Sequence, residues 1–184
     1  MHFRRLLATL IIMSFSTAAF ADSLDINLNN DSVQAIYATS WRSAEFNVGA
    51  LFNNDKNDWV ASTGLLANGE KVTGETRIEA GLGGKIYGAS VSNQDILALG
   101  LGGQLRVFPN NGPLAVSGYL FYAPDVVTFV DGKKFWEGGL RLEYEVIKKT
   151  ASVYIGVRKV KAKLDNGSEV TVDSGGHVGV RINF

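Results

Sequence analysis

The chain has 184 residues, with 18 Lys and Arg balanced by 18 Asp and Glu, and it contains no Cys. The lack of Cys excludes disulfides and thiolate sites, and the balanced charge offers no basic excess of the kind that binds nucleic acid. Beyond residue 21 no stretch approaches 18 consecutive apolar residues, which excludes a helical membrane protein.

The first 21 residues have the pattern of a secretory signal peptide. Arg4 and Arg5 form a positive start, residues 6–15 are apolar, and residues 19–21 (AFA) form a small-x-small cleavage site. The apolar run is shorter than the roughly 20 residues of a spanning helix, so an N-terminal membrane anchor is the weaker alternative. We therefore expect cleavage after Ala21 and a single mature domain over residues 22–184.

The remaining chain is predicted to be all-β. Turns rich in Asn, Asp and Gly separate candidate strands over residues 24–28, 33–41, 44–52, 59–67, 75–90, 96–108, 114–123, 135–147, 151–163 and 175–184. Several of these are much longer than an ordinary strand of about 5–6 residues, and such lengths suit a tilted strand that crosses a membrane. We expect a small antiparallel transmembrane β-barrel of ten strands, or of eight if the N-terminal third is organised differently.

The C-terminal strand predicts where the protein resides. Over residues 174–184 (SGGHVGVRINF) apolar or glycine residues alternate with polar or small ones, and the chain ends on an aromatic residue. The terminal Phe184 resembles the C-terminal assembly signal of bacterial outer-membrane barrels. We therefore expect export to the outer membrane, assembly through this strand by the barrel assembly machinery, and contact with outer-membrane lipid and lipopolysaccharide. Alternation alone is also compatible with a soluble β-sandwich or a lipocalin-like barrel.

Charged residues fall on the face opposite the apolar one in nearly every candidate strand. A basic residue that faces lipid at mid-membrane costs about 2–4 kcal/mol, so the charged face is expected to line the lumen. Lys159 and Lys161, near the end of a strand, fall on the apolar face instead. The predicted lumen charges are Glu45, Glu75, Arg77, Glu79, Lys85, Arg106, Glu137, Arg141, Glu143, Glu145, Arg158 and Arg181.

The connections divide into two groups. If Phe184 ends in the periplasm, the tight turns at 110–112 and 148–150 are periplasmic. Segments 123–134 and 163–174 then become outer loops, and we expect them to form the contact surfaces.

Three functions remain open. Six acids and six bases in a narrow lumen are expected to pair, which favours a closed barrel of structural or interaction type. A narrow channel is the alternative, biased toward anions by Arg106, Arg141, Arg158 and Arg181. A lipid-modifying enzyme is less favoured. Ser174 and His177 lie three residues apart on a strand and so face opposite sides.

The sequence predicts no catalytic, metal or cofactor site. His177 is the only imidazole after residue 21, and no Cys can supply further ligands. The glycine runs at 81–84 and 100–103 lie inside predicted strands with no helix following, so they do not form phosphate loops. Curvature, or room for large inward neighbours, explains such glycines better.

Four segments resemble the YfaZ family of bacterial outer-membrane proteins. They are 24–33 (LDINLNNDSV), 46–51 (FNVGAL), 78–87 (IEAGLGGKIY) and 97–107 (LALGLGGQLRV). The resemblance covers the whole of the chain after the signal peptide. It implies a small outer-membrane barrel and supplies no catalytic or binding residues.

Overall fold

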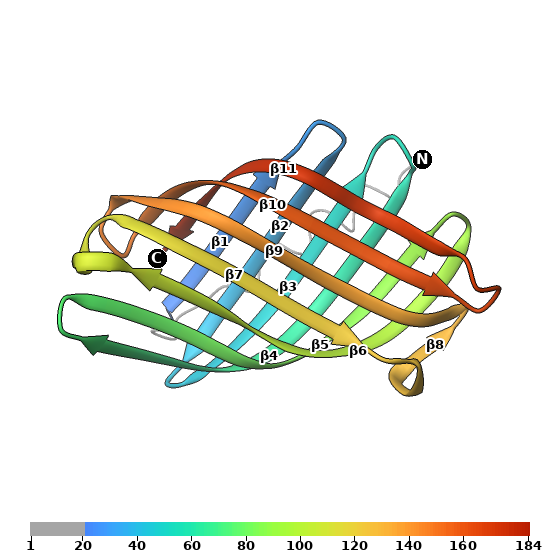
Figure 1. Ribbon diagram of the computed structural model, residues 1–184, viewed down its shortest axis with the longest axis horizontal. Helices are drawn as coiled ribbons and strands as arrows, with labels where there is room; N and C mark the ends of the chain where they lie inside the picture. The colour runs from blue at the N-terminus through green and yellow to red at the C-terminus, as the bar shows by residue number, and fades with distance from the viewer. Residues whose placement is uncertain (1–20) are drawn as a thin grey trace, which may run out of the picture.

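A computed structural model describes residues 21–184 as a closed antiparallel β-barrel (Figure 1). The predicted signal peptide lies outside the described residues, apart from Ala21, which begins the first strand. The elements are β1 (Ala21–Leu28), β2 (Ser32–Trp41), β3 (Ala44–Asn53), β4 (Asp58–Thr73), β5 (Thr76–Val91), β6 (Gln94–Phe108), η1 (Pro109–Asn111), β7 (Leu114–Ala123), η2 (Asp125–Val127), β8 (Thr128–Val130), β9 (Gly132–Ile147), β10 (Ala151–Leu164) and β11 (Glu169–Asn183).

Ten of these strands form the ring, which confirms the predicted number. Each strand pairs with its neighbour in order, β5 pairs with β6, and β1 pairs with β11 to close the sheet. The short β8 adds no position to the ring. It pairs with Ile96–Ala98 of β6, beyond the stretch of β6 that pairs with β7, so it continues the path of β7 after the η2 turn.

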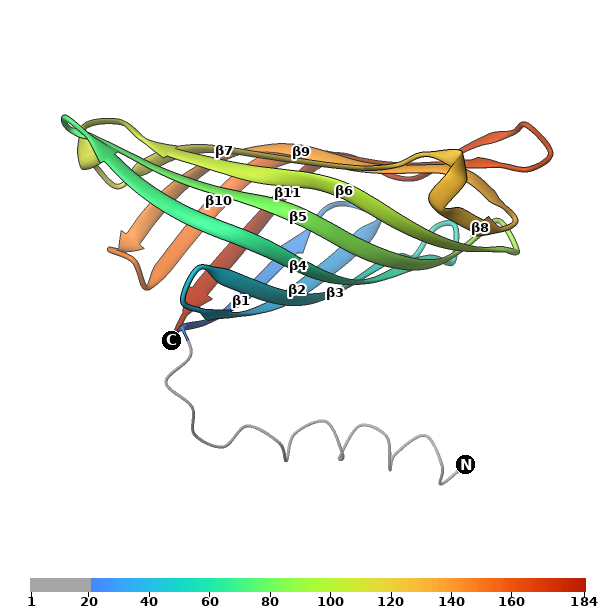
Figure 2. The same ribbon diagram turned by 90° about the horizontal axis from the view of Figure 1, so that it is seen from below.

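The barrel has two distinct ends. At one, here called the terminus end, backbone bonds join Asp22 to Phe184. The connections 42–43, 74–75, 109–113 and 148–150 lie at the same end. At the opposite, loop end lie the connections 29–31, 54–57, 92–93, 124–131 and 165–168. Because the strands are steeply tilted, the β4–β5 hairpin projects at the terminus end and the β10–β11 hairpin at the loop end (Figures 1 and 2).

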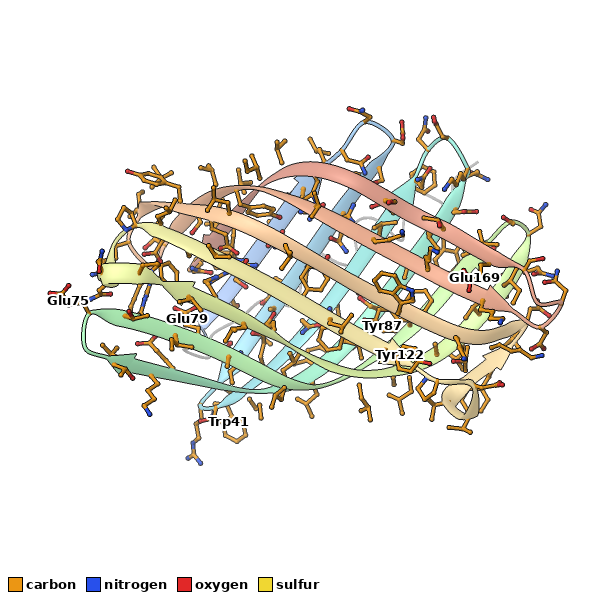
Figure 3. The ribbon with its side chains drawn as sticks, viewed as in Figure 1. Trp41, Glu75, Glu79, Tyr87, Tyr122 and Glu169 are labelled. Atoms are coloured by element: carbon orange, nitrogen blue, oxygen red, sulfur yellow. The ribbon has the colours of Figure 1, made fainter. Side chains whose placement is uncertain are left out.

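The outer wall of the barrel is apolar. Leucine, valine and isoleucine side chains at alternate strand positions are exposed, as at Leu101, Leu140 and Ile155, whereas the residues between them are buried. Trp41 projects outward and Tyr87 inward in Figure 3. A soluble barrel would carry the reverse arrangement, so this pattern excludes that alternative and fits a wall that faces lipid. Among the described residues there is no helix with the length and apolarity needed to cross a bilayer.

The two predicted outer loops are much shorter than expected. Segment 123–134 contains η2, β8 and the start of β9, and only residues 165–168 separate β10 from β11. The backbone of 128–130 bonds to β6, and 169–173 continues along β10 through a bulge beside Val160. These strand segments could not be predicted from the sequence, because polar residues and a bulge interrupt the alternation of apolar and polar residues.

The two glycine runs lie side by side. Gly83 of β5 and Gly102 of β6 are register partners. A Cβ atom at Gly83 would overlap the backbone oxygen of Leu65, and one at Gly102 would overlap that of Leu120. Glycine therefore permits three consecutive strand pairs to approach closely, as tight curvature of the sheet at this point requires.

Candidate functional site: the barrel lumen

An alternating chain of charges crosses the terminus half of the lumen. Strands β5, β6, β9, β11 and β1 supply its members, so residues far apart in sequence meet only in the closed barrel. In order of contact the members are Glu145, Arg77, Glu79, Arg106, Glu143, Arg181, Asp25 and Arg141. The side chains of Glu79, Arg106 and Arg181 keep partial exposure, whereas those of Arg77, Glu143 and Arg141 are buried.

Each contact between successive members of this series of charges is an ion pair. Arg77 lies 3.0 Å from Glu145 and 3.4 Å from Glu79. Arg106 bridges Glu79 at 3.0 Å and Glu143 at 3.1 Å. Removal of one member of a buried ion pair leaves the other charge unpaired. A variant that lacks one partner should therefore form a less stable closed barrel.

Asp25 accepts hydrogen bonds from four side chains, one of them the amide of Asn27 at 3.4 Å. Arg141 and Arg181 each donate to its Oδ2 atom at 2.8 Å, and the hydroxyl of Tyr154 donates to Oδ1. Arg181 is also its register partner on β11, so this contact spans the seam where the first and last strands meet. The Arg141 guanidinium lies 4.4 Å from the centre of the Tyr154 ring, which adds a cation–π contact.

A second cluster surrounds Arg158 at mid-barrel. Its Nε atom donates to Asp173 at 2.7 Å, and the side chain of Arg158 is completely buried. Other donors of the same guanidinium reach Asn27, Gln34 and Ser32. Several strands thus satisfy one buried cation, as such a cation requires.

Two smaller contacts extend the polar lumen. Glu137 accepts the hydroxyl of Tyr87 at 2.9 Å and lies 4.0 Å from the Lys85 ammonium. Half-buried Glu45 accepts hydrogen bonds from Asn47 and Asn68. The second Glu45 contact ties β3 to the base of the projecting β4–β5 hairpin.

Apolar side chains form most of the interior of the loop half of the lumen, beside a few buried polar residues such as Ser32, Asn53 and Asp173. The rings of Tyr87 and Phe135 lie 4.6 Å apart, and Phe121 is 1% exposed. The buried cluster comprises Leu51, Val60, Leu66, Tyr87, Ala89, Val91, Ile96, Ala98, Phe121, Ala123, Phe135, Val160, Ala162, Leu164 and Val172. A cavity beside Gln34 and Glu137 has a volume of only about 10 Å³. The lumen therefore combines a charged half with a packed half that is mainly apolar.

The predicted lumen charges point inward with one exception. Glu75 lies in the exposed turn between β4 and β5, beyond the paired strands (Figure 3). Its prediction was wrong because the alternation was counted through a turn in which Gly74 has a φ of +60°. The structure joins Arg77, Glu79, Arg106, Arg141, Glu143, Glu145 and Arg181 in one chain, and it sets Arg158, Glu137 with Lys85, and Glu45 in separate contacts.

Sequence reasoning did not place the two aspartates that anchor these clusters in the lumen. The alternation of Leu24, Ile26 and Leu28 directs Asp25 to the opposite, inward face, but three apolar positions are too few to define a period. Asp173 falls in the predicted outer loop 163–174, whereas in the structure it lies on β11 next to a bulge. A bulge shifts the alternating pattern, so no simple periodicity could have found Asp173.

The serine and histidine of the C-terminal strand do not form a pair. Ser174 is exposed and His177 is buried in the lumen, as the odd spacing predicts. Neither ring nitrogen of His177 has a hydrogen-bond partner within residues 21–184. In the same part of the chain, no three His, Cys, Asp or Glu residues are grouped so as to hold a metal ion.

Comparisons with known proteins give one family and a general likeness of fold. The family model described as "YfaZ precursor" matches residues 2–184. The outer-membrane channel DcaP of Acinetobacter baumannii is 11% identical with a TM-score of 0.37; the match covers 87% of this chain and 54% of that channel, so the chain spans about half its length. The NanC porin is 10% identical with a TM-score of 0.39, over 90% of this chain and 99% of the porin. No curated protein matches the chain.

Proposed function

The chain belongs to the YfaZ family and is a β-barrel of the bacterial outer membrane, and we propose that it works as a closed barrel of structural or interaction type. The observation that carries this proposal is the filling of the lumen. Charges pair across its terminus half, and aromatic and aliphatic side chains pack its loop half. Ions that entered from the terminus end would meet the apolar layer around Phe121 and Phe135.

The balance of the charges also favours a closed lumen. The alternating chain holds four acids and four bases, so their formal charges cancel. A pore selective for anions would need an excess of unpaired cations along its path. Here Arg106, Arg141, Arg158 and Arg181 all donate to carboxylates.

No catalytic step is assigned to the lumen. Within residues 21–184 the one imidazole, that of His177, lies inside the barrel, and the hydroxyl nearest to it in sequence, that of Ser174, lies on the outer wall. A nucleophile and its base must lie within hydrogen-bonding reach of each other.

Conductance in a planar lipid bilayer tests the proposal. We expect the inserted protein to give no unitary steps, because the layer around Phe121 and Phe135 blocks the path. The double variant Phe121→Ala/Phe135→Ala removes two buried rings and should give steps, which establishes that the assay detects an open barrel. Steps from the unmodified protein whose ion selectivity changes in Arg106→Glu would instead establish the narrow channel.

A further inference from the structure

The outer wall carries a group of lysines at the loop end of β9 and β10. On β10 the outward positions run Val153, Ile155 and Val157 and continue with Lys159, Lys161 and Lys163, while the residues between them are buried. Lys134 of β9 is exposed and is the register partner of Lys163. We call Lys134, Lys159, Lys161 and Lys163 the lysine patch.

The patch lacks enough counter-charge of its own. Glu169 lies 3.5 Å from Lys161, and within the described chain no other carboxylate is within ion-pair distance of a patch lysine. Lys134 and Lys163 stand directly opposite each other, an arrangement that destabilises a sheet when both residues carry the same charge. An anionic group bound from outside would remove this repulsion.

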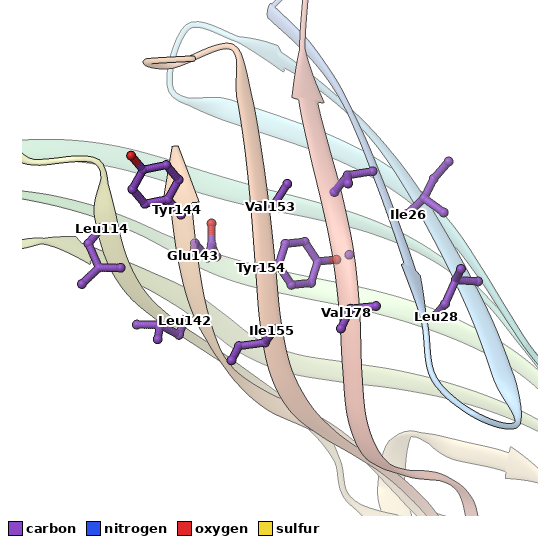
Figure 4. A pocket seen from close by; sticks show the side chains of 12 residues that line it. Ile26, Leu28, Leu114, Leu142, Glu143, Tyr144, Val153, Tyr154, Ile155 and Val178 are labelled. Carbon is purple, nitrogen blue, oxygen red and sulfur yellow. The ribbon is translucent and has the colours of Figure 1, made fainter. Parts of the chain in front are cut away.

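An apolar groove lies on the same wall, closer to the terminus end. It has a volume of about 580 Å³ and is lined by outward aliphatic side chains of β1, β9, β10 and β11, among them Ile26, Leu142, Val153, Ile155, Val178 and Val180 (Figure 4). From Ile155 in the groove to Lys159 is four residues of one strand, or about 13 Å. A single strand therefore leads directly from the groove to the patch.

We propose that this wall binds the phosphorylated glycolipid of the outer leaflet, with its phosphates on the lysine patch and an acyl chain in the groove. With the termini in the periplasm, as is usual for such barrels, the loop end reaches the outer leaflet. The patch spans Lys159 to Lys163, about 13 Å, which suits a headgroup with two phosphates better than a phospholipid with one. Trp136, the register partner of Lys161, sets an aromatic residue beside the patch, and tryptophan is enriched at membrane interfaces.

This inference names a partner for the interaction role proposed above, but it depends on the outer wall alone. A conducting lumen would overturn the closed-barrel proposal and leave the lipid site intact. Loss of the lipid site would leave the closed lumen intact.

Binding of bisphosphorylated lipid A to the refolded protein, followed by native mass spectrometry from detergent micelles, tests the patch. Each lysine near an anionic surface contributes about a fivefold factor in affinity, so Lys134→Gln/Lys159→Gln/Lys163→Gln should weaken binding by about a hundredfold. The matched control Lys71→Gln/Lys148→Gln/Lys149→Gln removes three exposed lysines at the terminus end and should bind as the unmodified protein does.

A second pair of variants tests the groove. Ile155→Trp fills the groove, whereas Leu120→Trp places the same ring elsewhere on the exposed outer wall. Lipid A binding should fall several-fold, by about the contribution of a few buried methylenes, only in Ile155→Trp. Equal losses in either matched pair would overturn the proposal, as would phosphatidylglycerol that binds as tightly as lipid A and with the same dependence on the patch.

Discussion

At the scale of single residues, the lumen depends on a few carboxylate acceptors that several donors share. Asp25 accepts from two arginines and a tyrosine, and Asp173 accepts from Arg158, Asn29 and Ser32. A shared acceptor avoids the desolvation cost of burying additional carboxylates. Its removal, however, takes a partner away from more than one donor.

Replacement of Asp25 by Asn should therefore destabilise the barrel strongly. It would remove the carboxylate that Arg141 contacts and leave Arg181 with only its longer contact to Glu143, and the free energy of unfolding should fall by about 3–5 kcal/mol. Urea-induced unfolding of the refolded protein in lipid vesicles measures this change. The control Glu75→Gln removes an exposed charge in a turn and should shift the value by less than about 0.5 kcal/mol. Equal stability of Asp25→Asn and Glu75→Gln would contradict the paired-lumen account.

At the scale of elements, the paired glycine runs of β5 and β6 determine how tightly the barrel bends. At Gly102 a side chain would meet the backbone of β7, which cannot rotate away as a flexible side chain can. At Gly88, on the neighbouring strand, no heavy atom lies within 4 Å of the position of a Cβ atom.

The variants Gly102→Ala and Gly88→Ala should therefore differ sharply. Gly102→Ala should reduce the folded fraction several-fold, because strands β6 and β7 would have to separate where they bond, whereas Gly88→Ala should fold normally. The heat-modifiable shift in gel mobility of refolded barrels measures the folded fraction. Normal folding of Gly102→Ala would show that these strands tolerate a wider spacing.

The strand pattern accounts for how much of the molecule was predictable. Long alternating segments such as β6 and β9 gave both the barrel and the faces of their charges, because a period of two residues fixes direction once one face is known. The two-residue pattern did not predict strand position or side-chain direction at β8, at the bulge beside Asp173 or at the turn with Glu75, because the period is interrupted there. Ion-pair partners such as Arg106 and Glu143 were not predictable, because their strands meet only across the closed lumen.

At the scale of the whole molecule, the barrel is closed by contacts between residues at the start of β1 and just after the end of β11. The backbones of Asp22 and Phe184 exchange hydrogen bonds of 2.9 and 2.8 Å, while the Phe184 side chain is 67% exposed. The aromatic ring thus contributes little to packing inside the folded barrel.

We therefore predict that Phe184→Ala impairs assembly in cells but not stability. If the ring is an assembly signal, the amount of folded protein in the outer membrane should fall several-fold, while the midpoint of urea unfolding of the refolded variant stays unchanged. Fractionation of the outer membrane and unfolding in vitro measure the two effects separately. Normal membrane levels of the variant would remove the assembly role of Phe184.

The alternating charges also have a mechanical consequence. The contacts of Arg77 with Glu145, of Arg106 with Glu143 and of Asp25 with Arg141 each join strands that are not neighbours in the wall. These ion pairs span the lumen and hold opposite parts of the wall at a set distance. The width of the barrel therefore depends on side chains as well as on the hydrogen-bonded sheet. Lateral pressure from the surrounding lipid would then compress these ion pairs, and the barrel would resist flattening.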